Sequence, residues 1–351
     1  PGGGLTASEA GGTSAYTIRL NSEPTGAVTV KLNFTDTQIK LNRSGSPLSL
    51  SFSPTCPSAT CWSTPQTVTV SAVDDSDLEG AHNATISYTI TGADYAGLSA
   101  TSATVAVTDN DTAALIITES GGSTSVVEGG ATDSYTVKLA SRPTANVTVS
   151  IAFSGSQIKV NGSTTAPQTL TFPREDWNTS QTVTLTAVDD ASAEGSHSAV
   201  LAHSASGGGY ASAPTVNVTT AITDNDSPGL VVVQTGSPAT TAVSEGGSAD
   251  TYTIKLSSPP SGNVSVSLSF NTADLKLNTS STSPLVLTFT TANWNTAQTV
   301  SVTANSDLLA QGNRTSNIDH TVSSGADALY NALGLVTGAR VAVAVTDTTT
   351  Q

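Results

Sequence analysis

The chain has 351 residues and a formal net charge of −15, from 27 acidic and 12 basic residues. This balance repels phosphate backbones and no basic patch offsets it, so the composition argues against nucleic-acid binding. Ser, Thr, Ala, Val and Gly dominate the sequence. A regular alternation of apolar and polar residues nevertheless gives every segment a face to bury, which argues against a disordered linker.

The sequence contains three copies of one pattern. Glu-Gly-Gly or a near match, followed by Tyr-x-[Ile/Val]-[Lys/Arg]-Leu, occurs at 9–20, 128–139 and 245–256, and one Trp follows each copy, at Trp62, Trp177 and Trp294. The landmarks recur about every 115 residues, which is the size of a domain. We therefore expect three domains in tandem, 1–111, 112–226 and 227–351.

The first copy opens differently from the other two. It begins Pro-Gly-Gly-Gly-Leu, whereas apolar strands are predicted at the start of the second copy (114–118) and the third (230–233). Two interpretations remain open. The chain is a fragment of a longer array cut near a repeat edge, or another subunit donates the missing strand and links subunits head to tail by β-augmentation.

Cys56 and Cys61 lie in an insertion of four residues that only the first copy carries. Their spacing favours a local disulfide, because a metal site would need further Cys or His ligands and none is nearby in the sequence. A disulfide indicates an oxidising compartment, and we expect an extracellular or cell-surface protein. No apolar run is long enough to span a bilayer, so membrane insertion is not expected.

Short strands account for the rest of the second copy. Alternating or apolar segments predict strands at 114–118, 134–139, 146–153, 168–172, 181–188, 198–204 and 216–223, with Gly, Pro, Asn and Ser between them. Such spacing predicts an all-β fold, an antiparallel Greek-key β-sandwich of the immunoglobulin-like type, and three in tandem predict an elongated rod. Trp177 and Tyr135 are interpreted as core and corner aromatics.

Acidic residues recur in three segments of the first two copies. They are the opening Glu, the motif Ala-Val-Asp-Asp-x-x-x-Glu-Gly and the closing Thr-Asp-Asn-Asp. Six carboxylates in three loops would repel one another unless a cation lay among them, and Ca²⁺ prefers six to eight oxygen ligands. The alternative is that these residues only form turns. The candidate ligands are Glu9, Asp74, Asp75, Glu79, Asp109, Asp111, Glu128, Asp189, Asp190, Glu194, Asp224 and Asp226.

Together with Pro-x-x-x-Val-Thr-Val and the Thr-Val-rich strand after each Trp, these motifs resemble the Calx-β domain family over essentially the whole chain. The resemblance implies immunoglobulin-like sandwiches, which occur in sodium–calcium exchangers, an integrin tail and many bacterial surface proteins. It also implies Ca²⁺ bound at one end of the sandwich, through the opening Glu, the Asp-Asp-x-x-x-Glu loop and the closing Asp-x-Asp. The resemblance is closer in the first two copies than in the third.

The third copy departs from the acidic pattern. Ser306, Gln311, Thr348 and Thr349 replace Asp74, Glu79, Asn110 and Asp111, so that Glu245, Asp307 and Asp347 remain. We expect no Ca²⁺ there. Two recurrent histidines, His82 and His197, become Arg314 in this copy, and His203 and His320 align with Tyr88. All four histidines are interpreted as surface or packing residues rather than ligands.

Asn-x-Ser/Thr sequons occur throughout, and many arise by chance in so Ser/Thr-rich a chain. Two of them, at Asn110 and Asn225, fall within the acidic motifs. The remaining candidates for glycosylation are Asn33, Asn42, Asn83, Asn146, Asn161, Asn178, Asn217, Asn263, Asn278 and Asn313.

No motif of a hydrolase, metalloprotease or phosphate-binding enzyme occurs, and a repeated domain argues against an active site assembled once from unlike residues. We therefore expect a non-enzymatic extracellular structural protein, a rod-like subunit that self-associates into a filament or surface fibre and is stiffened by Ca²⁺. The alternative is the stalk or binding module of a cell-surface adhesin that recognises a glycan or protein through the loops at 42–47, 161–167 and 278–284.

Overall fold

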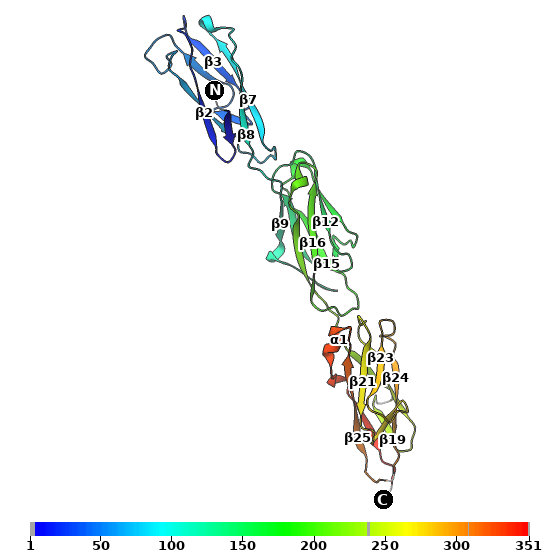
Figure 1. Cartoon of the computed structure of the whole chain (residues 1–351). Helices are drawn as coiled ribbons and strands as arrows, with labels where there is room; N and C mark the ends of the chain where they lie inside the picture. Colours follow the sequence, from blue (N-terminus) through cyan, green and yellow to red (C-terminus); the bar gives the residue numbers. More distant parts are fainter. Residues whose placement is uncertain (1–3, 237–238, 308, 350–351) are drawn as a thin grey trace.

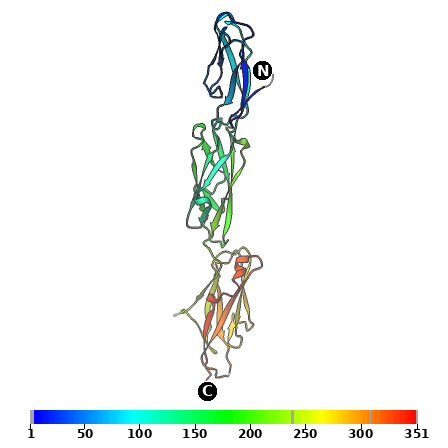
Figure 2. The same cartoon turned by 90° about the vertical axis from the view of Figure 1, so that its left-hand side faces the viewer.

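A computed structural model describes residues 4–236, 239–307 and 309–349. The chain forms three β-sandwich units that follow one another in sequence order (Figures 1 and 2). Each unit consists of two sheets packed face to face around its own core. The predicted all-β class and the predicted immunoglobulin-like sandwiches are confirmed.

Unit one has a five-stranded sheet in the order β1-β8-β7-β3-β5 and a three-stranded sheet in the order β2-β6-β4. Its elements are β1 (Leu5–Ser8), β2 (Thr13–Ile18), β3 (Val28–Asn33), β4 (Ile39–Leu41), β5 (Leu48–Phe52), β6 (Gln66–Ala72), β7 (His82–Thr91), the 3-10 turn η1 (Ala93–Tyr95) and β8 (Ala103–Thr108).

Unit two has the same five-stranded sheet, β10-β17-β16-β12-β14, but four strands in the other sheet, β13-β15-β11-β9. Its elements are β9 (Leu115–Glu119), η2 (Ser120–Gly122), β10 (Thr124–Val127), β11 (Asp133–Leu139), β12 (Val147–Ala152), β13 (Ile158–Val160), β14 (Gln168–Phe172), η3 (Arg174–Asp176), β15 (Gln181–Ala187), β16 (His197–Ser206), η4 (Tyr210–Ser212) and β17 (Val216–Thr223).

Unit three repeats this arrangement, with sheets β19-β26-β25-β21-β23 and β18-β20-β24-β22. Its elements are β18 (Leu230–Gln234), β19 (Thr241–Ser244), β20 (Asp250–Leu256), β21 (Val264–Phe270), β22 (Leu275–Leu277), β23 (Leu285–Phe289), β24 (Gln298–Ala304), β25 (Arg314–Ser323), α1 (Ala328–Leu333), η5 (Thr337–Ala339) and β26 (Val341–Thr346). The short helix α1 was not predicted, because six residues are too few to show a helical period.

Neighbouring strands are antiparallel except for one parallel pair in each unit, β1 with β8, β10 with β17 and β19 with β26. The sequence predicted β14 and β17 with their observed bounds, while β10 and β13 were missed. These two strands have four and three residues, too few to display a period of two.

Alternation along each strand builds the cores. On β12, Val147, Val149 and Ile151 are fully buried, whereas Thr148 between them is exposed. Burying one such side chain stabilises a fold by roughly 1.5–3 kcal/mol. Each unit therefore has a hydrophobic core of its own, separate from the other two.

The aromatic residues have two roles in the cores. Tyr135 and Tyr252 are 1% and 0% exposed. The three Trp residues are partly buried and pack against the edge of each core. A second tyrosine was not predicted to be structural: the hydroxyl of Tyr210 donates to the carbonyl of Ser141 at 2.6 Å and accepts from its amide at 3.0 Å. Tyr330 makes the same contact with Ser258 in unit three.

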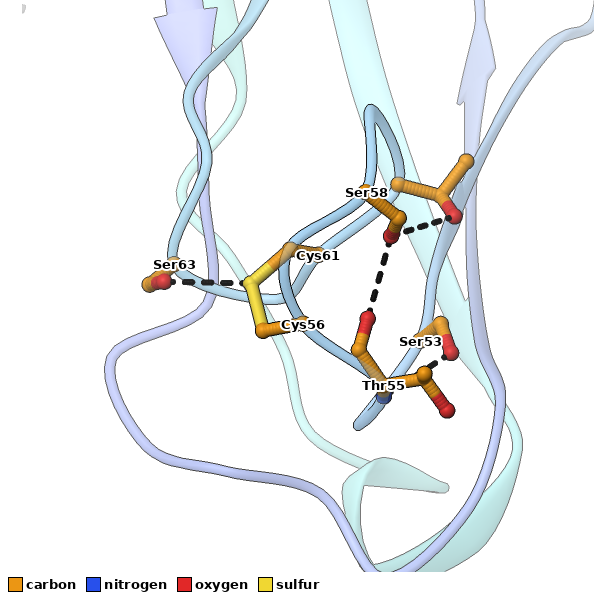
Figure 3. The surroundings of a disulfide bond; sticks show 7 residues. Ser53, Thr55, Cys56, Ser58, Cys61 and Ser63 are labelled. Atoms are coloured by element: carbon orange, nitrogen blue, oxygen red, sulfur yellow. Dashed lines mark hydrogen bonds between the residues drawn. A yellow bond between two sulfur atoms is a disulfide. The ribbon is translucent and has the colours of Figure 1, made fainter.

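The predicted disulfide joins Cys56 and Cys61, whose Cα atoms are 5.1 Å apart. Figure 3 shows the small loop that it closes between β5 and β6. Ser53, at the start of the loop, pairs with its end, since the amide of Ser53 donates to the carbonyl of Thr60 and the carbonyl of Ser53 accepts from the amide of Trp62. The insertion is therefore a closed surface loop that leaves the sandwich intact.

Candidate functional site

The three acidic loops of a unit lie at one end of its sandwich. Because β1 and β8 are parallel and in register, with Ser8 opposite Thr108, the segments that follow both strands leave at the same end. The amide of Glu9 donates to the carbonyl of Thr108 at 3.1 Å. The loop between β6 and β7, residues 73–81, joins them there. In Figure 1 this is the end that faces unit two.

In unit one, Glu9, Asp109 and Asp111 each offer an oxygen within 4.8 Å of the others. Backbone amides hold this arrangement in place. Asp109 accepts from the amides of Glu79 and Gly80 at 2.9 and 2.6 Å, and from the amide of Asp111 at 2.7 Å. The closing motif therefore pins the Asp-Asp-x-x-x-Glu loop against the opening Glu.

The remaining candidate ligands of unit one lie outside this group of three. Asp74 accepts from the side chain of Asn110 at 3.1 Å, and Asp75 accepts from the amide of Asp77 at 2.8 Å. Glu79 accepts from the side chain of Gln38 at 3.0 Å. These three carboxylates lie in the loop beside the central group rather than within it.

Unit two repeats the arrangement. Glu128, Asp224 and Asp226 each offer an oxygen within 4.8 Å of the others, and Asp224 accepts from the amides of Glu194 and Gly195 at 2.6 Å each. Asp189 again accepts from a neighbouring side chain, that of Asn225, at 3.1 Å, and Asp190 accepts from the amide of Ser192 at 2.6 Å.

His197, predicted to be a surface or packing residue, lies in a second group of unit two with Glu128 and Glu194. One ring nitrogen is within 4.8 Å of ligand oxygens from Glu128 and Glu194. Its Nδ1 lies 2.8 Å from the carbonyl of Gly195. The regular placement of His after Glu-Gly was the signal that could have identified it.

The carboxylates oppose one another's ionisation. Burial raises the pKa of Glu9 and of Glu128, and neighbouring carboxylates raise each further. The pKa of Asp111 and of Asp226 is raised for the same two reasons. Burial also acts on Asp224, but three backbone amides outweigh it and lower the pKa of that carboxyl. Each group therefore combines one carboxylate that accepts several backbone amides with others that lack a counter-charge.

Three carboxylate oxygens in these groups, those of Asp111 Oδ2, Glu128 Oε2 and Asp226 Oδ2, are buried and have no hydrogen-bond partner among the described residues. A buried oxygen of this kind is costly unless a proton or a cation satisfies it. Carboxylate oxygens converging from loops are the ligands that Ca²⁺ takes in proteins. The residues of units one and two therefore fit a calcium ion.

Unit three does not fit one. Glu245 is 4% exposed and Asp347 accepts from the amides of Gln311 and Gly312, as in the other units. However, the third position of the central group is Thr349 rather than an Asp. Arg314 forms an ion pair with Glu245, with 3.1 Å between Nη2 and Oε1. A guanidinium therefore supplies a counter-charge to the buried carboxylate of this unit, although Glu245 Oε2 and Arg314 Nη1 have no hydrogen-bond partner among the described residues.

Unit one differs from the others at the edge of its smaller sheet. β11 of unit two pairs with β15 on one side and β9 on the other, and β20 of unit three has β24 and β18. In unit one, β2 pairs with β6, and none of the described residues pairs with its other edge. Tyr16 and Ile18 on this strand remain partly exposed, whereas Tyr135 and Val137 are buried.

A groove of about 960 Å³ runs along this open edge. Its floor is the strand itself, with Tyr88 from the opposite sheet. The lining residues are Gly4, Leu5, Ser14, Ala15, Tyr16, Thr17, Ile18, Arg19, Asn21, Pro65 and Tyr88. The groove occupies the place that corresponds to β9 in unit two.

The comparisons with known proteins add structural neighbours. The calcium-binding domain CBD12 of CALX1.1 is 13% identical over 66% of this chain and 99% of that chain, with a TM-score of 0.28. An I-band fragment of titin is 12% identical over 98% of this chain and 95% of that chain, with a TM-score of 0.29. A bacterial ice-binding adhesin is 16% identical over 99% of this chain and 95% of that chain, with a TM-score of 0.23.

No protein-family model matches the chain, and no curated protein matches it. The assignment of the three units therefore rests on their own strands. They are tandem immunoglobulin-like β-sandwiches. Within the described residues, no helix has the length and apolar character needed to cross a membrane.

The acidic loop of unit one also contacts unit two. Asp77 and Arg142 form an isolated parallel bridge, in which Leu78 N donates to Arg142 O at 2.8 Å and Arg142 N donates to Ser76 O at 2.6 Å. Asp77 also lies 3.4 Å from the guanidinium of Arg142 and 3.3 Å from that of Arg174. Leu78 packs against the core of unit two.

The matching loop of unit two lacks these groups. Ser192 and Ala193 replace Asp77 and Leu78, and Pro259 replaces Arg142. Proline has no amide hydrogen to donate, so the same bridge cannot form. Among the described residues, the two junctions therefore differ in how the units are tied together.

Most of the sequons are accessible. Asn33 is partly buried, and the other nine glycosylation candidates are exposed. Asn42, Asn161 and Asn278 also have a structural role, since each has a positive φ and its side-chain oxygen accepts a backbone amide of the neighbouring strand at 2.8–2.9 Å. These three residues form the same turn in all units.

Proposed function

We propose that this chain is a non-enzymatic extracellular structural protein, a rod-like subunit of a filament or surface fibre. The observation that carries the proposal is the open edge of β2 in unit one. The series of units in Figure 1 gives such a subunit its length, and the open edge gives it a place where a neighbouring subunit attaches.

An open sheet edge invites pairing, because its backbone donors and acceptors have no partner in the sheet. Proteins usually block such edges with Lys, Pro or a bulge. The sequence of β2, Thr-Ser-Ala-Tyr-Thr-Ile, has no Lys and no Pro. The edge is therefore suited to accept a strand by β-augmentation.

The other units indicate what strand fits. β9 runs antiparallel to β11, with Leu115 opposite Leu139 and Ile117 opposite Val137. A donated strand that paired with β2 in the same register would place its aliphatic residues opposite Leu20 and Ile18. The donated strand would then cover Tyr16 and Ile18, as β9 covers their counterparts in unit two.

Calcium is the second part of the proposal. Ions held by Glu9, Asp109 and Asp111 in unit one, and by Glu128, Asp224 and Asp226 in unit two, would remove the repulsion among these carboxylates. The loop that carries Asp74, Asp75 and Glu79 also forms the bridge to Arg142. An ion that orders this loop would therefore stiffen the junction between units one and two.

The disulfide between Cys56 and Cys61 supports an oxidising compartment outside the cell, because such bonds persist there and are rare in the cytosol. The sequons on the surface are compatible with the same compartment. A structural role needs no catalytic residue, and each unit repeats the same architecture.

A synthetic strand tests the proposal. Each unit has a single Trp, so replacing Trp177 and Trp294 with Phe leaves Trp62 to report the unfolding of unit one. A peptide with the sequence of residues 113–119 is expected to fill the groove and raise the midpoint of thermal unfolding of unit one. The control peptide has Thr in place of Leu115 and Ile117, the two residues whose side chains face the core of unit two, and keeps the rest of the sequence.

Two results would contradict the proposal. One is a midpoint that neither peptide changes, and the other is the same rise with both peptides. A chain whose own upstream residues complete the sheet would also show no response, and would identify the edge as an internal contact of a longer chain rather than a link between subunits.

A further inference from the structure

One position at the start of the long strand distinguishes unit three. His82 and His197 begin β7 and β16, opposite Val107 and Ile222, and Arg314 begins β25 opposite Val345. The register is the same in all units. The change from His to Arg therefore places a permanent positive charge where the other two units carry an imidazole.

Arg314 joins two acidic residues. Its Nε donates to Asp274 Oδ1 at 2.7 Å, and its Nη2 donates to Glu245 Oε1 at 3.1 Å. The side chain of Glu245 is 1% exposed, so this carboxylate depends on the guanidinium for a counter-charge. Burial acts to raise the pKa of Asp274, but Arg314 and Ser316 outweigh it and the pKa is lowered.

Two further positions change with Arg314. Gln38 and Gln157 donate to Glu79 and Glu194 in units one and two, at 3.0 and 3.3 Å. In unit three the Gln position holds Asp274 and the Glu position holds Gln311. The acidic residue has thus moved to the position from which it contacts the guanidinium, and the loop has lost a carboxylate.

We propose that Arg314 supplies in unit three the positive charge that Ca²⁺ supplies in units one and two. The acidic end of unit three is then held together without a metal ion, and the chain binds calcium in its first two units alone. The comparison with calcium rests on the proposed function, whereas the pairing of Arg314 with Glu245 and Asp274 does not.

The test replaces Arg314 with the His of the other units and follows Trp294 after Trp62 and Trp177 have been changed to Phe. Removing one partner of a buried ion pair leaves an uncompensated charge. R314H is therefore expected to lower the unfolding midpoint of unit three by on the order of 10 °C, and added Ca²⁺ should not restore it, because Ser306 and Thr349 lack carboxylates.

The matched control is R340A. Arg340 pairs with Asp319 in the same unit, but its side chain is 47% exposed, so its removal should change the midpoint by a few degrees at most. A second variant separates charge from shape. E245Q added to R314H removes the buried charge and is expected to recover most of the lost midpoint, even where R314H alone does not fold.

The outcomes are distinguishable. R314H no less stable than R340A, or no recovery with E245Q, would overturn the role of Arg314. A calcium-induced rise in the wild-type midpoint at Trp294, equal to that at Trp62 and Trp177, would overturn it too. Absence of a calcium response at Trp62 and Trp177 would instead contradict the proposed calcium sites, while a large loss in R314H would still support the ion pair.

Discussion

At the residue scale, buried histidines distinguish units two and three from unit one. His203 is 0% exposed, with its Nδ1 3.0 Å from the carbonyl of Val216 and its Nε2 2.7 Å from the hydroxyl of Tyr135. A carbonyl can only accept, so Nδ1 carries the hydrogen and Tyr135 donates to Nε2. Both nitrogens of the neutral ring are satisfied. In unit one the pair is Tyr16 and Tyr88.

This pair predicts a pH dependence for unit two. Burial lowers the pKa of His203 below its ordinary value of 6.5. As the pH falls, the unfolded chain therefore binds a proton before the folded chain does. The neutral ring's contribution to the free energy of unfolding is fully present above pH 6.5 and is lost as the pH drops below it. The loss is at most about 1.4 kcal/mol per pH unit.

Urea unfolding followed by Trp177 at pH 7.5 and pH 5.5 measures this dependence. H203Q keeps hydrogen-bonding groups but does not titrate, so the difference between the two pH values should shrink. H82Q, in unit one, should leave the difference at Trp177 unchanged. An equal pH dependence in H203Q and the wild type would rule out His203 as its source.

At the scale of elements, the loop between β6 and β7 contributes both to the acidic site of unit one and to the contact with unit two. Residues 74–80 carry candidate calcium ligands on the side of unit one and form the bridge at Asp77 and Arg142 on the side of unit two. The equivalent loop of unit two faces Pro259 and cannot form that bridge. The first junction should therefore be stiffer than the second.

We expect R142P to loosen the first junction. It removes both the amide that donates to Ser76 and the guanidinium that pairs with Asp77. R142A is the matched control, because it keeps the amide and should have an intermediate effect. Small-angle X-ray scattering would show a broader distribution of distances and a smaller average dimension for R142P. Identical scattering from the wild type and both variants would contradict a role for the bridge.

At the scale of the whole molecule, the proposed assembly of the three-unit chain depends on the open edge of β2. A strand supplied from within the chain would satisfy the edge and leave nothing for a neighbour to pair with. Units two and three are closed in this way by β9 and β18. Assembly through unit one therefore depends on the absence of such a strand from its sheet.

Grafting residues 112–123 ahead of Leu5 should close the edge of unit one. The grafted chain is expected to stay monomeric and to unfold at a higher temperature at Trp62, whereas electron microscopy of the unmodified chain should show filaments with a regular repeat. A calcium chelator should make those filaments fray at the junctions. Filaments of equal length from the grafted chain would sink the strand-donation proposal.

Much of this fold could be predicted from the sequence, because its signals are local. The alternation of Val147, Val149 and Ile151 identifies a half-buried strand, and the three repeats define the units. The close spacing of Cys56 and Cys61 predicted their bond. The acidic loops were also visible as motifs, since each is a short continuous segment.

Other features depend on contacts between distant segments, and only the tertiary structure decided them. The contact of Glu9 with Asp109 and Asp111 could not be predicted from the sequence, because it results from the parallel pairing of β1 with β8. The position of Arg314 between Asp274 and Glu245 could not be predicted either. The same holds for the contact between Asp77 and Arg142 of the next unit. Periodicity shows which face of a strand is buried, whereas the register between strands determines which side chains meet there.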